Sequence, residues 1–232
     1  MKHTCLGLFV TATDTGVGKT WVATMAARQL SRQGIRVGAY KPAASGVEDG
    51  RWADIDALGD AIGGEFPAER ICPQRFDAPL APPEAARRED REVDAGLLRS
   101  GARWWNRQVD LLLIEGVGGL LCPLTETETV ADLAADLGWP IVIVARNALG
   151  TINHTLLTID AARHRGLDIS GVILNQPGPP DPLDRSLETN ARTIGRLGGV
   201  EILGHVAHGG HDLLPPDGTA TIDWSELAGR RR

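Results

Sequence analysis

One stretch near the start of the chain limits its possible folds more than any other feature of the sequence. A short apolar run at residues 6–11 leads almost directly into the loop Thr13-Asp14-Thr15-Gly16-Val17-Gly18-Lys19-Thr20, and a segment of helical composition follows over residues 20–33. A strand, a glycine-containing loop ending in Gly-Lys-Thr and a helix, in this order, are typical of a phosphate-binding loop, whose backbone N–H groups surround the phosphates. In such a loop Lys19 contacts the β- and γ-phosphates, and the Thr20 hydroxyl can bind Mg²⁺. The sequence therefore predicts a site for a nucleoside triphosphate.

Apolar runs and helical segments alternate along the rest of the chain. Further strands are predicted at 36–41, 111–115, 141–145, 169–175 and 201–207, and further helices at 54–62, 95–107, 130–137, 151–165 and 183–197. Because these strands are continuous runs of Val, Ile and Leu, both faces of the sheet should be covered by helices. We predict an α/β fold with a single doubly wound, mainly parallel sheet, like that of P-loop NTPases, and ligands beyond the carboxyl ends of the strands.

Length and composition favour one domain. With 232 residues, 42% of them hydrophobic, the chain can bury a full core. We predict a single domain over residues 1–232, with a core at about 4–207 and a flexible tail at about 208–232, which is rich in Gly and Pro and ends in three arginines. The polar, proline-containing segment 73–92 is predicted to be a surface excursion that can carry a short helix.

The charge balance and the cysteines restrict partners and compartment. The chain has 24 Lys plus Arg against 30 Asp plus Glu, a net charge of −6, which argues against nucleic acid or an anionic membrane surface as a partner. Cys5, Cys72 and Cys122 are single and follow no metal-ligand spacing, so we interpret them as reduced structural thiols. The first apolar run is too short for a signal peptide, and we expect a cytoplasmic protein.

A second acid and a second lysine are predicted at the same sheet edge as the phosphate loop. Glu115 ends the strand at 111–115 and precedes Gly116-Val117-Gly118-Gly119, so it is our candidate Mg²⁺ ligand from a neighbouring strand. Lys41 ends the strand at 36–41, just before Pro42. On pattern alone a catalytic and a merely structural role for Lys41 stay equally open, and Asp56 is a weaker candidate still.

Taken together, four motifs resemble the dethiobiotin synthetase family over most of residues 6–206. They are the phosphate loop, Lys41-Pro42 with Ser45-Gly46, Glu115-Gly116-Val117-Gly118-Gly119 and Leu149-Gly150-Thr151-Ile152-Asn153-His154. The resemblance implies the closure of a cyclic urea on 7,8-diaminononanoate with CO₂ and ATP, which gives dethiobiotin, ADP and phosphate in biotin synthesis. It also implies that Mg²⁺ accompanies the ATP, and that a carbamate and a carbamic-phosphoric anhydride form on the way.

The resemblance further implies a role for each matching position. Lys19 and Lys41 are the expected catalytic residues, and Thr20, Asp56 and Glu115 the expected Mg²⁺ ligands. The diamine is expected at Thr15, Lys41, Ser45, Gly150, Thr151 and Asn153, with its carboxylate bound across the interface of a homodimer at the start of the helix at 151–165. The expected nucleotide contacts are Thr15, Gly16, Val17, Gly18, Lys19, Thr20, Trp21, Asp56, Glu115, Gly116, Val117, Gly118, Asn175, Gln176, Val206, Ala207 and His208. Asn175 matches the family's adenine-reading asparagine, although an asparagine often only ends a strand.

The chain departs from the family pattern in three places. Ala12 replaces the glycine usual before Thr-Asp-Thr, Gly16 stands where some members carry an acid, and Val206-Ala207-His208 replaces an apolar-Pro pattern near the base. The first two departures remove no residue that is expected to bind phosphate or Mg²⁺. The third changes residues that are expected to line the adenine pocket.

Two other functions compete with this one. A ParA/MinD-like switch ATPase would share the sheet, but it carries a lysine five residues before the phosphate-loop lysine, where this chain has Asp14. A non-catalytic nucleotide-binding sensor could lose its site residues, yet Lys19, Thr20, Lys41, Ser45 and Glu115 are all retained. Nucleotide binding without turnover of a diamine would favour the sensor.

Overall fold

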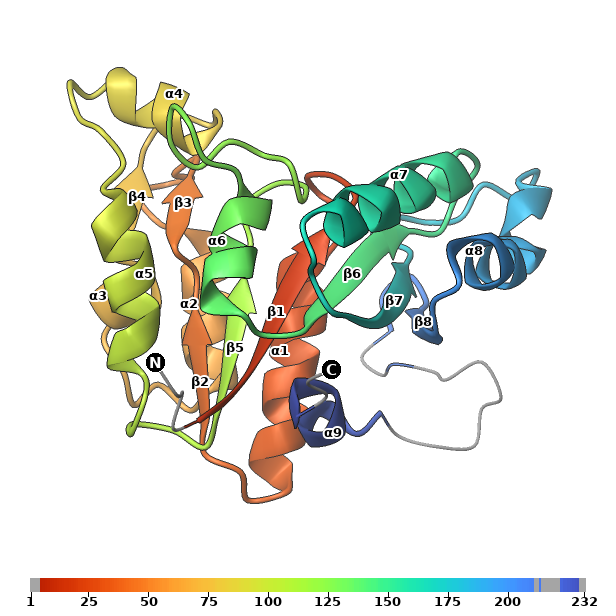
Figure 1. The fold of residues 1–232 in the computed structure, drawn as a ribbon, viewed down its shortest axis with the longest axis horizontal. Coiled ribbons are helices and arrows are strands. Elements are labelled where there is room, and N and C mark those ends of the chain that lie inside the picture. The colour runs from red at the N-terminus through yellow and green to blue at the C-terminus, as the bar shows by residue number, and fades with distance from the viewer. Residues whose placement is uncertain (1–4, 211–212, 214–221, 230–232) are drawn as a thin grey trace.

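A parallel sheet runs through the centre of the computed structural model, which describes residues 5–210, 213 and 222–229 (Figure 1). In this described part, six strands pair in the order β2-β5-β1-β6-β7-β8, and all their pairings are parallel. The strands are β1 (Leu6–Ala12), β2 (Val37–Tyr40), β5 (Leu111–Glu115), β6 (Ile141–Arg146), β7 (Ile169–Asn175) and β8 (Ile202–Val206). The predicted doubly wound fold is confirmed.

The strand order creates the crevice in which such sheets bind ligands. The chain starts in the central strand β1, moves to β2 on one side, and later continues through β6 to β8 on the other side. The order therefore reverses beside β1, and the phosphate loop leaves the sheet at that point. The register brings Val10 of β1 opposite Glu115 of β5, and Tyr40 of β2 opposite Ile114, so Lys41 and Glu115 emerge at the same edge.

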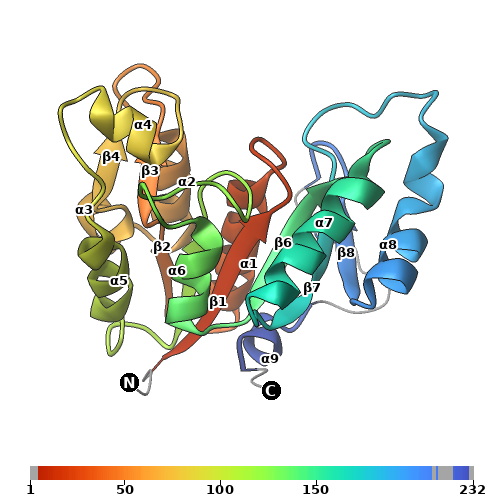
Figure 2. The same cartoon turned by 45° about the horizontal axis from the view of Figure 1, so that its top comes forward.

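Helices cover both faces of the sheet because its strands are apolar on both sides. The strand β5 is buried throughout, and only the first residue of β1 is exposed. Helix α1 lies on one face, and α6 and α7 lie on the other (Figure 2). The longer helices of the described residues are α1 (Lys19–Arg32), α2 (Ala53–Ala61), α5 (Ala95–Trp104), α6 (Val130–Leu137), α7 (Thr151–His164) and α8 (Asn190–Gly198).

A small second sheet stands above the carboxyl end of β2 (Figure 2). It consists of two parallel strands, β3 (Ala43–Ser45) and β4 (Gln74–Phe76), and it is accompanied by the short helices α3 (Ala68–Ile71) and α4 (Pro82–Arg87). Helix α4 is the short helix predicted within 73–92, with Pro82 in its first turn. The strand pair was not predicted, because three-residue strands are too short to have a recognisable period.

Two predictions about the carboxyl-terminal third were wrong. The single helix predicted at 183–197 is a 3₁₀ turn, η1 (Arg185–Glu188), followed by α8. The tail was predicted to be flexible from residue 208, but its described residues 222–229 include a helix, α9 (Trp224–Gly229), which packs against β1 and α1. The buried Trp224 holds it there, since its indole N–H donates to Gln29 at 2.9 Å. The other tail residues, 211–212, 214–221 and 230–232, lie outside the described residues.

Candidate nucleotide and substrate site

The phosphate loop is held open by two glycines in the left-handed region. Gly16 has φ 68° and Gly18 has φ 99°, conformations that other residues adopt at a cost. Gly18 is the N-cap of α1 and has no side chain to cap it, so the first N–H groups of the helix are available to an anion. Lys19 is 7% exposed, and its Nζ donates to the Asp14 carbonyl at 3.4 Å. Burial lowers the pKa of Lys19, and the nearby Glu115 carboxylate opposes this shift only in part.

Asn175, at the end of β7, packs directly against this loop. Its Nδ2 donates to the Val17 carbonyl at 2.7 Å, and the side chain is almost fully buried. A Cβ on Gly18 would lie 2.0 Å from the same Nδ2, so glycine is required there for this contact. Asn175 therefore does more than end a strand, because it fixes the shape of the loop.

A lysine, two carboxylates and a hydroxyl meet beside Lys19, and we call Lys41, Asp54 and Glu115 the charged centre. Lys41 Nζ donates to Glu115 Oε1 at 2.7 Å and forms a close ion pair with Asp54. The Thr20 hydroxyl donates to the same Glu115 oxygen at 2.8 Å. Lys41 is 5% exposed and Glu115 is 1% exposed, so both charges are removed from water.

Lys41 and Asp54 of this centre stabilise each other's charged forms. Burial alone would lower the pKa of Lys41, but the carboxylates of Glu115 and Asp54 outweigh it and hold that pKa above the ordinary lysine value. Burial would likewise raise the pKa of Asp54, yet Lys41 outweighs it, and the Asp54 pKa lies below its usual range. Lys41 is therefore a fixed cation and not a general base.

Asp54, and not Asp56, belongs to this centre. The Asp56 carboxylate accepts from Arg51 Nε at 2.8 Å in a largely exposed ion pair. Both residues lie on α2, and residues two positions apart on a helix point about 200° apart. Because the Asp54 side chain faces Lys41, the Asp56 side chain points away from it. The structure thus places Asp54, and not the predicted Asp56, beside Lys41.

The phosphate loop and the charged centre open into one cavity of about 780 Å³. Ten of its lining residues were predicted from the sequence: Thr15, Gly16, Gly18, Lys19, Thr20, Lys41, Ser45, Glu115, Val117 and Gly118. The cavity also has walls that the sequence did not reveal: Asp54, Pro79, Leu80, Ala81 and Cys122. Residues 79–81 are brought there by the β3–β4 pair, which no motif signals.

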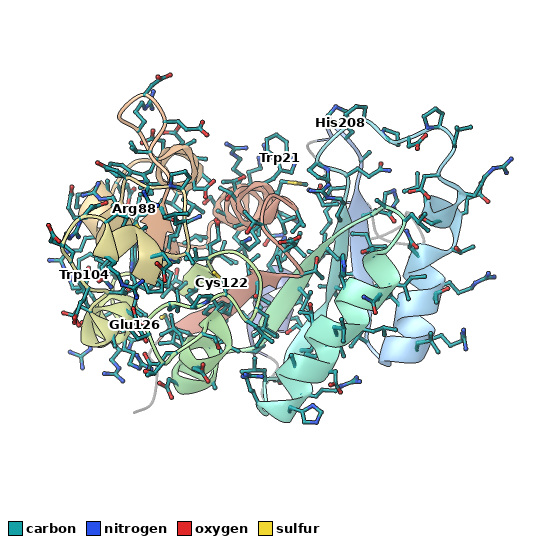
Figure 3. The ribbon with its side chains drawn as sticks, turned by 90° about the horizontal axis from the view of Figure 1, so that it is seen from above. Trp21, Arg88, Trp104, Cys122, Glu126 and His208 are labelled. Carbon is teal, nitrogen blue, oxygen red and sulfur yellow. The ribbon has the colours of Figure 1, made fainter. Side chains whose placement is uncertain are left out.

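A second cavity of about 480 Å³ continues from the first toward α7. The two share Thr15 and Cys122, and the second is also lined by His154 and Leu157 of α7. Cys122 was interpreted as structural from the sequence, but it is half-buried at the junction of both spaces. Burial raises the pKa of its thiol, which argues against a reactive thiolate. Figure 3 looks onto this edge of the sheet and labels Cys122 and Trp21.

Comparison with known proteins agrees with this geometry. A family model described as an AAA domain matches residues 6–209. The ATP-dependent dethiobiotin synthetase BioD of Anaeromyxobacter dehalogenans (strain 2CP-C) is 50% identical over 191 residues, which cover 82% of this chain and 85% of the relative. The enzyme of the same name from Rhodopirellula baltica is 38% identical over 213 residues, with 85% and 82% covered.

The chain belongs to the ATP-dependent dethiobiotin synthetase family.

Solved structures resemble the fold more distantly. The signal recognition particle receptor FtsY from Elizabethkingia anophelis in complex with GDP has a TM-score of 0.56 at 15% identity, and the match covers 100% of this chain and 66% of the other. Chloroplast FtsY from Physcomitrella patens has a TM-score of 0.54 at 14% identity, over 99% of this chain and 66% of the other. At these identities the likeness concerns the fold alone.

The remaining positions expected from dethiobiotin synthetases lie outside the larger cavity. Gly116 directly follows β5, and its N–H donates to the carbonyl of Val10 in β1. The expected base contacts lie at the ends of β7 and β8 or just beyond them, where the Gln176 N–H donates to the Val206 carbonyl at 3.0 Å; they are Asn175, Gln176, Val206, Ala207 and His208. The segment expected to hold the substrate carboxylate comprises Gly150, the N-cap of α7, followed by Thr151 and Asn153 in its first turn.

Among the residues that the structure describes, no group of three or more His, Cys, Asp or Glu side chains is arranged to hold a metal ion. Within the same residues, no helix combines the length and apolar character needed to cross a membrane.

Proposed function

We propose that this chain is a dethiobiotin synthetase, an ATP-dependent ligase that closes a cyclic urea on 7,8-diaminononanoate with CO₂ in biotin biosynthesis. The observation that carries the proposal is the meeting of two buried lysines, Lys19 and Lys41, with the Glu115 carboxylate in one cavity. A phosphate loop alone would serve many reactions. A second fixed cation beside it suits a reaction in which another anion must meet the γ-phosphate.

The chemistry needs no nucleophile from the protein. One amine of the substrate takes up CO₂ and becomes a carbamate, whose oxygen attacks the γ-phosphorus and releases ADP. The second amine then attacks the carbamoyl carbon, the C–O bond to phosphate breaks, and the ring closes. Lys19 binds the β- and γ-phosphates, and Lys41 neutralises the carbamate and the transferring phosphoryl oxygens. Catalysis is therefore positional and electrostatic.

The residues beside Lys41 fit a Mg²⁺ ion. Glu115 Oε2 is buried and has no hydrogen-bond partner among the described residues, while the Thr20 hydroxyl and the Asp54 carboxylate lie next to it. When bound, the ion neutralises charge on the β- and γ-phosphates. We assign Thr20, Asp54 and Glu115 to hold it, with the phosphates as further ligands because two carboxylates alone form no complete site.

Asn175 suits an adenine base for a geometric reason. Its Nδ2 is engaged by the Val17 carbonyl, which requires a donor, so the amide cannot turn over without losing that bond. Its Oδ1 is then the atom left to accept from a base, which matches the amino group of adenine and not the carbonyl of guanine. We infer that Asn175, together with Gln176 and residues 206–208, selects ATP.

The active enzyme is proposed to be a homodimer. The first turn of α7 begins after Gly150, which provides no side-chain cap, so its N–H groups suit the substrate carboxylate. The second cavity leads from Thr15 to Leu157 of α7, an exposed apolar side chain that suits contact with a partner subunit. The free cysteines fit a reducing compartment, and we expect the reaction to take place in the cytoplasm.

An isotope experiment tests this reaction path. The purified chain is given Mg·ATP, 7,8-diaminononanoate and ¹⁸O-labelled bicarbonate, and the products are analysed by mass spectrometry. The path predicts dethiobiotin with one label in the urea carbonyl and one label in the released phosphate. Phosphate that takes its oxygen from water, at a rate independent of the diamine, would point instead to a switch ATPase. Binding of ATP without any turnover would point to the sensor.

A further inference from the structure

Trp21 links the phosphate loop to the turn that follows β8. It follows Thr20 directly, in the first turn of α1, and its indole N–H donates to the Gly210 carbonyl at 3.0 Å. Gly210 closes a turn after β8, in which its own N–H donates to the Ala207 carbonyl and Gly209 has φ 69°. The phosphate loop and the turn at 207–210 are thus joined across 189 positions of sequence.

The same two loops are also joined on the side of β7. Asn175 binds the carbonyl of Val17, and Gln176 binds that of Val206. The base contacts expected from the sequence also lie at the ends of β7 and β8, so a base bound there would lie close to the turn that Trp21 holds. Figure 3, which looks onto this edge, labels Trp21 of α1 and His208, which follows β8.

Trp21 is more exposed than the other tryptophans of the described residues. Trp105, Trp139 and Trp224 are each at most 2% exposed, whereas Trp21 is 37% exposed although its N–H is engaged. A tryptophan fixed by its N–H, with part of its ring surface accessible beside a nucleotide loop, has the features that base stacking uses.

We propose that Trp21 is the stacking residue of the base site, with its N–H holding the 207–210 turn and its ring contacting the nucleotide base. This inference rests on the proposed function only in that the chain binds ATP. Stacking accepts any base, so Trp21 contributes affinity for the nucleoside, while the Asn175 amide distinguishes adenine from guanine. It is therefore expected to matter for ATP and not for a ligand without a base.

Binding measurements on the full chain test this directly. Dissociation constants of Mg·ATP and of Mg-tripolyphosphate are measured by calorimetry for the wild type, Trp21→Ala and Trp21→Phe. We expect Trp21→Ala to weaken ATP binding by about tenfold to a hundredfold and to leave tripolyphosphate binding within about twofold. Trp21→Phe retains a ring without the N–H donor and should stay within about fivefold of the wild type for ATP.

Each other outcome overturns the proposal. Equal weakening of both ligands by Trp21→Ala would make Trp21 a support of the phosphate loop only. Equal loss in the Phe and Ala variants would assign the effect to the bond with Gly210. ATP should also quench indole fluorescence in the wild type and in Trp104→Phe, but not in Trp21→Phe. Because no diamine is used, failure here is distinguishable from failure of dethiobiotin synthesis.

Discussion

The buried charges of Lys41 and Glu115 lower the stability of the fold, and the proposed reaction makes use of them. Each is at most 5% exposed, and burying such charges costs several kcal/mol per ion unless they are paired. The pairing with Asp54 and Thr20 offsets that cost and leaves Lys41 cationic. The result is a positive charge whose position does not have to change when the substrates arrive, which is the condition for electrostatic catalysis.

The two lysines are expected to fail differently. Lys41→Ala should reduce ring closure by about a hundredfold to a thousandfold, because it removes charge that acts on the transferring group. It should leave the dissociation constant of Mg·ATP within a few-fold. Lys19→Ala should weaken ATP binding itself. Titrations of nucleotide binding, with thermal melts as the control for folding, separate the two, and equal loss of binding in both variants would contradict the assigned roles.

Asp54 and Asp56 offer a matched pair on one helix. Asp54→Asn removes a carboxylate from the charged centre, so activity should fall by about tenfold or more and the Mg²⁺ concentration needed for half-maximal rate should rise. Asp56→Asn changes the same chemical group in an exposed ion pair with Arg51 and should keep near wild-type activity. A Mg²⁺ titration of both variants provides the measurement. If Asp56→Asn were the more damaged variant, Asp54 would not be the carboxylate that holds Mg²⁺.

At the residue scale the sequence predicts those site residues that end strands. Lys41 and Glu115 follow from strand ends, because parallel strands deliver their last residues to one edge. Asp54 could not be assigned, since two acids two positions apart on a helix are equal candidates until the phase of the helix is known. Leu80 and Cys122 carry no signal either, because their approach to the cavity depends on how loops fold over it.

At the scale of elements, the long apolar strands and helices were predictable and the short ones were not. The strands at Leu111–Glu115 and Ile169–Asn175 and the helix at Val130–Leu137 have the predicted bounds. Helix α6 begins with Thr129 and Asp132, which bind each other's backbone in a capping box. By contrast, β3, β4 and α9 are short and lie among Pro and Gly, and tertiary contacts decide their structure.

Helix α9 yields a prediction about stability. Trp224 is 1% exposed, binds Gln29, and belongs to a helix that packs on β1 and α1. Trp224→Ala should lower the free energy of unfolding by about 3–5 kcal/mol, and Trp224→Phe by clearly less, because it retains most of the buried ring. Urea unfolding followed by circular dichroism measures this. An unchanged midpoint for Trp224→Ala would mean that α9 is not part of the stable core.

At the scale of the whole molecule, the proposed dimer divides each active site between two subunits. Asn153→Asp adds a negative charge in the first turn of α7, where acids stabilise a helix but repel a substrate carboxylate. The KM for 7,8-diaminononanoate should rise by about tenfold or more, while that for ATP stays unchanged. Asn153→Ala, which adds no charge, is the control and should have a smaller effect.

Mixing two damaged variants tests the division of the site. If α7 acts on its partner's site, a dimer of one Lys41→Ala subunit and one Asn153→Asp subunit contains one complete site. At diamine concentrations well below the raised KM, where Asn153→Asp sites contribute little, random reassociation of an equal mixture should restore about a quarter of wild-type activity, because half the dimers are mixed and each has one intact site of two. Mixtures no more active than their components would mean that each site is built within one subunit.

The most direct test of the central claim is phosphate release by the purified wild-type protein with Mg·ATP and bicarbonate, with and without 7,8-diaminononanoate. Dethiobiotin is quantified in parallel by mass spectrometry. We predict one phosphate for each dethiobiotin and release only when the diamine is present. Phosphate release at the same rate without the diamine, or dethiobiotin absent from the products, would contradict the function argued from Lys19, Lys41 and Glu115.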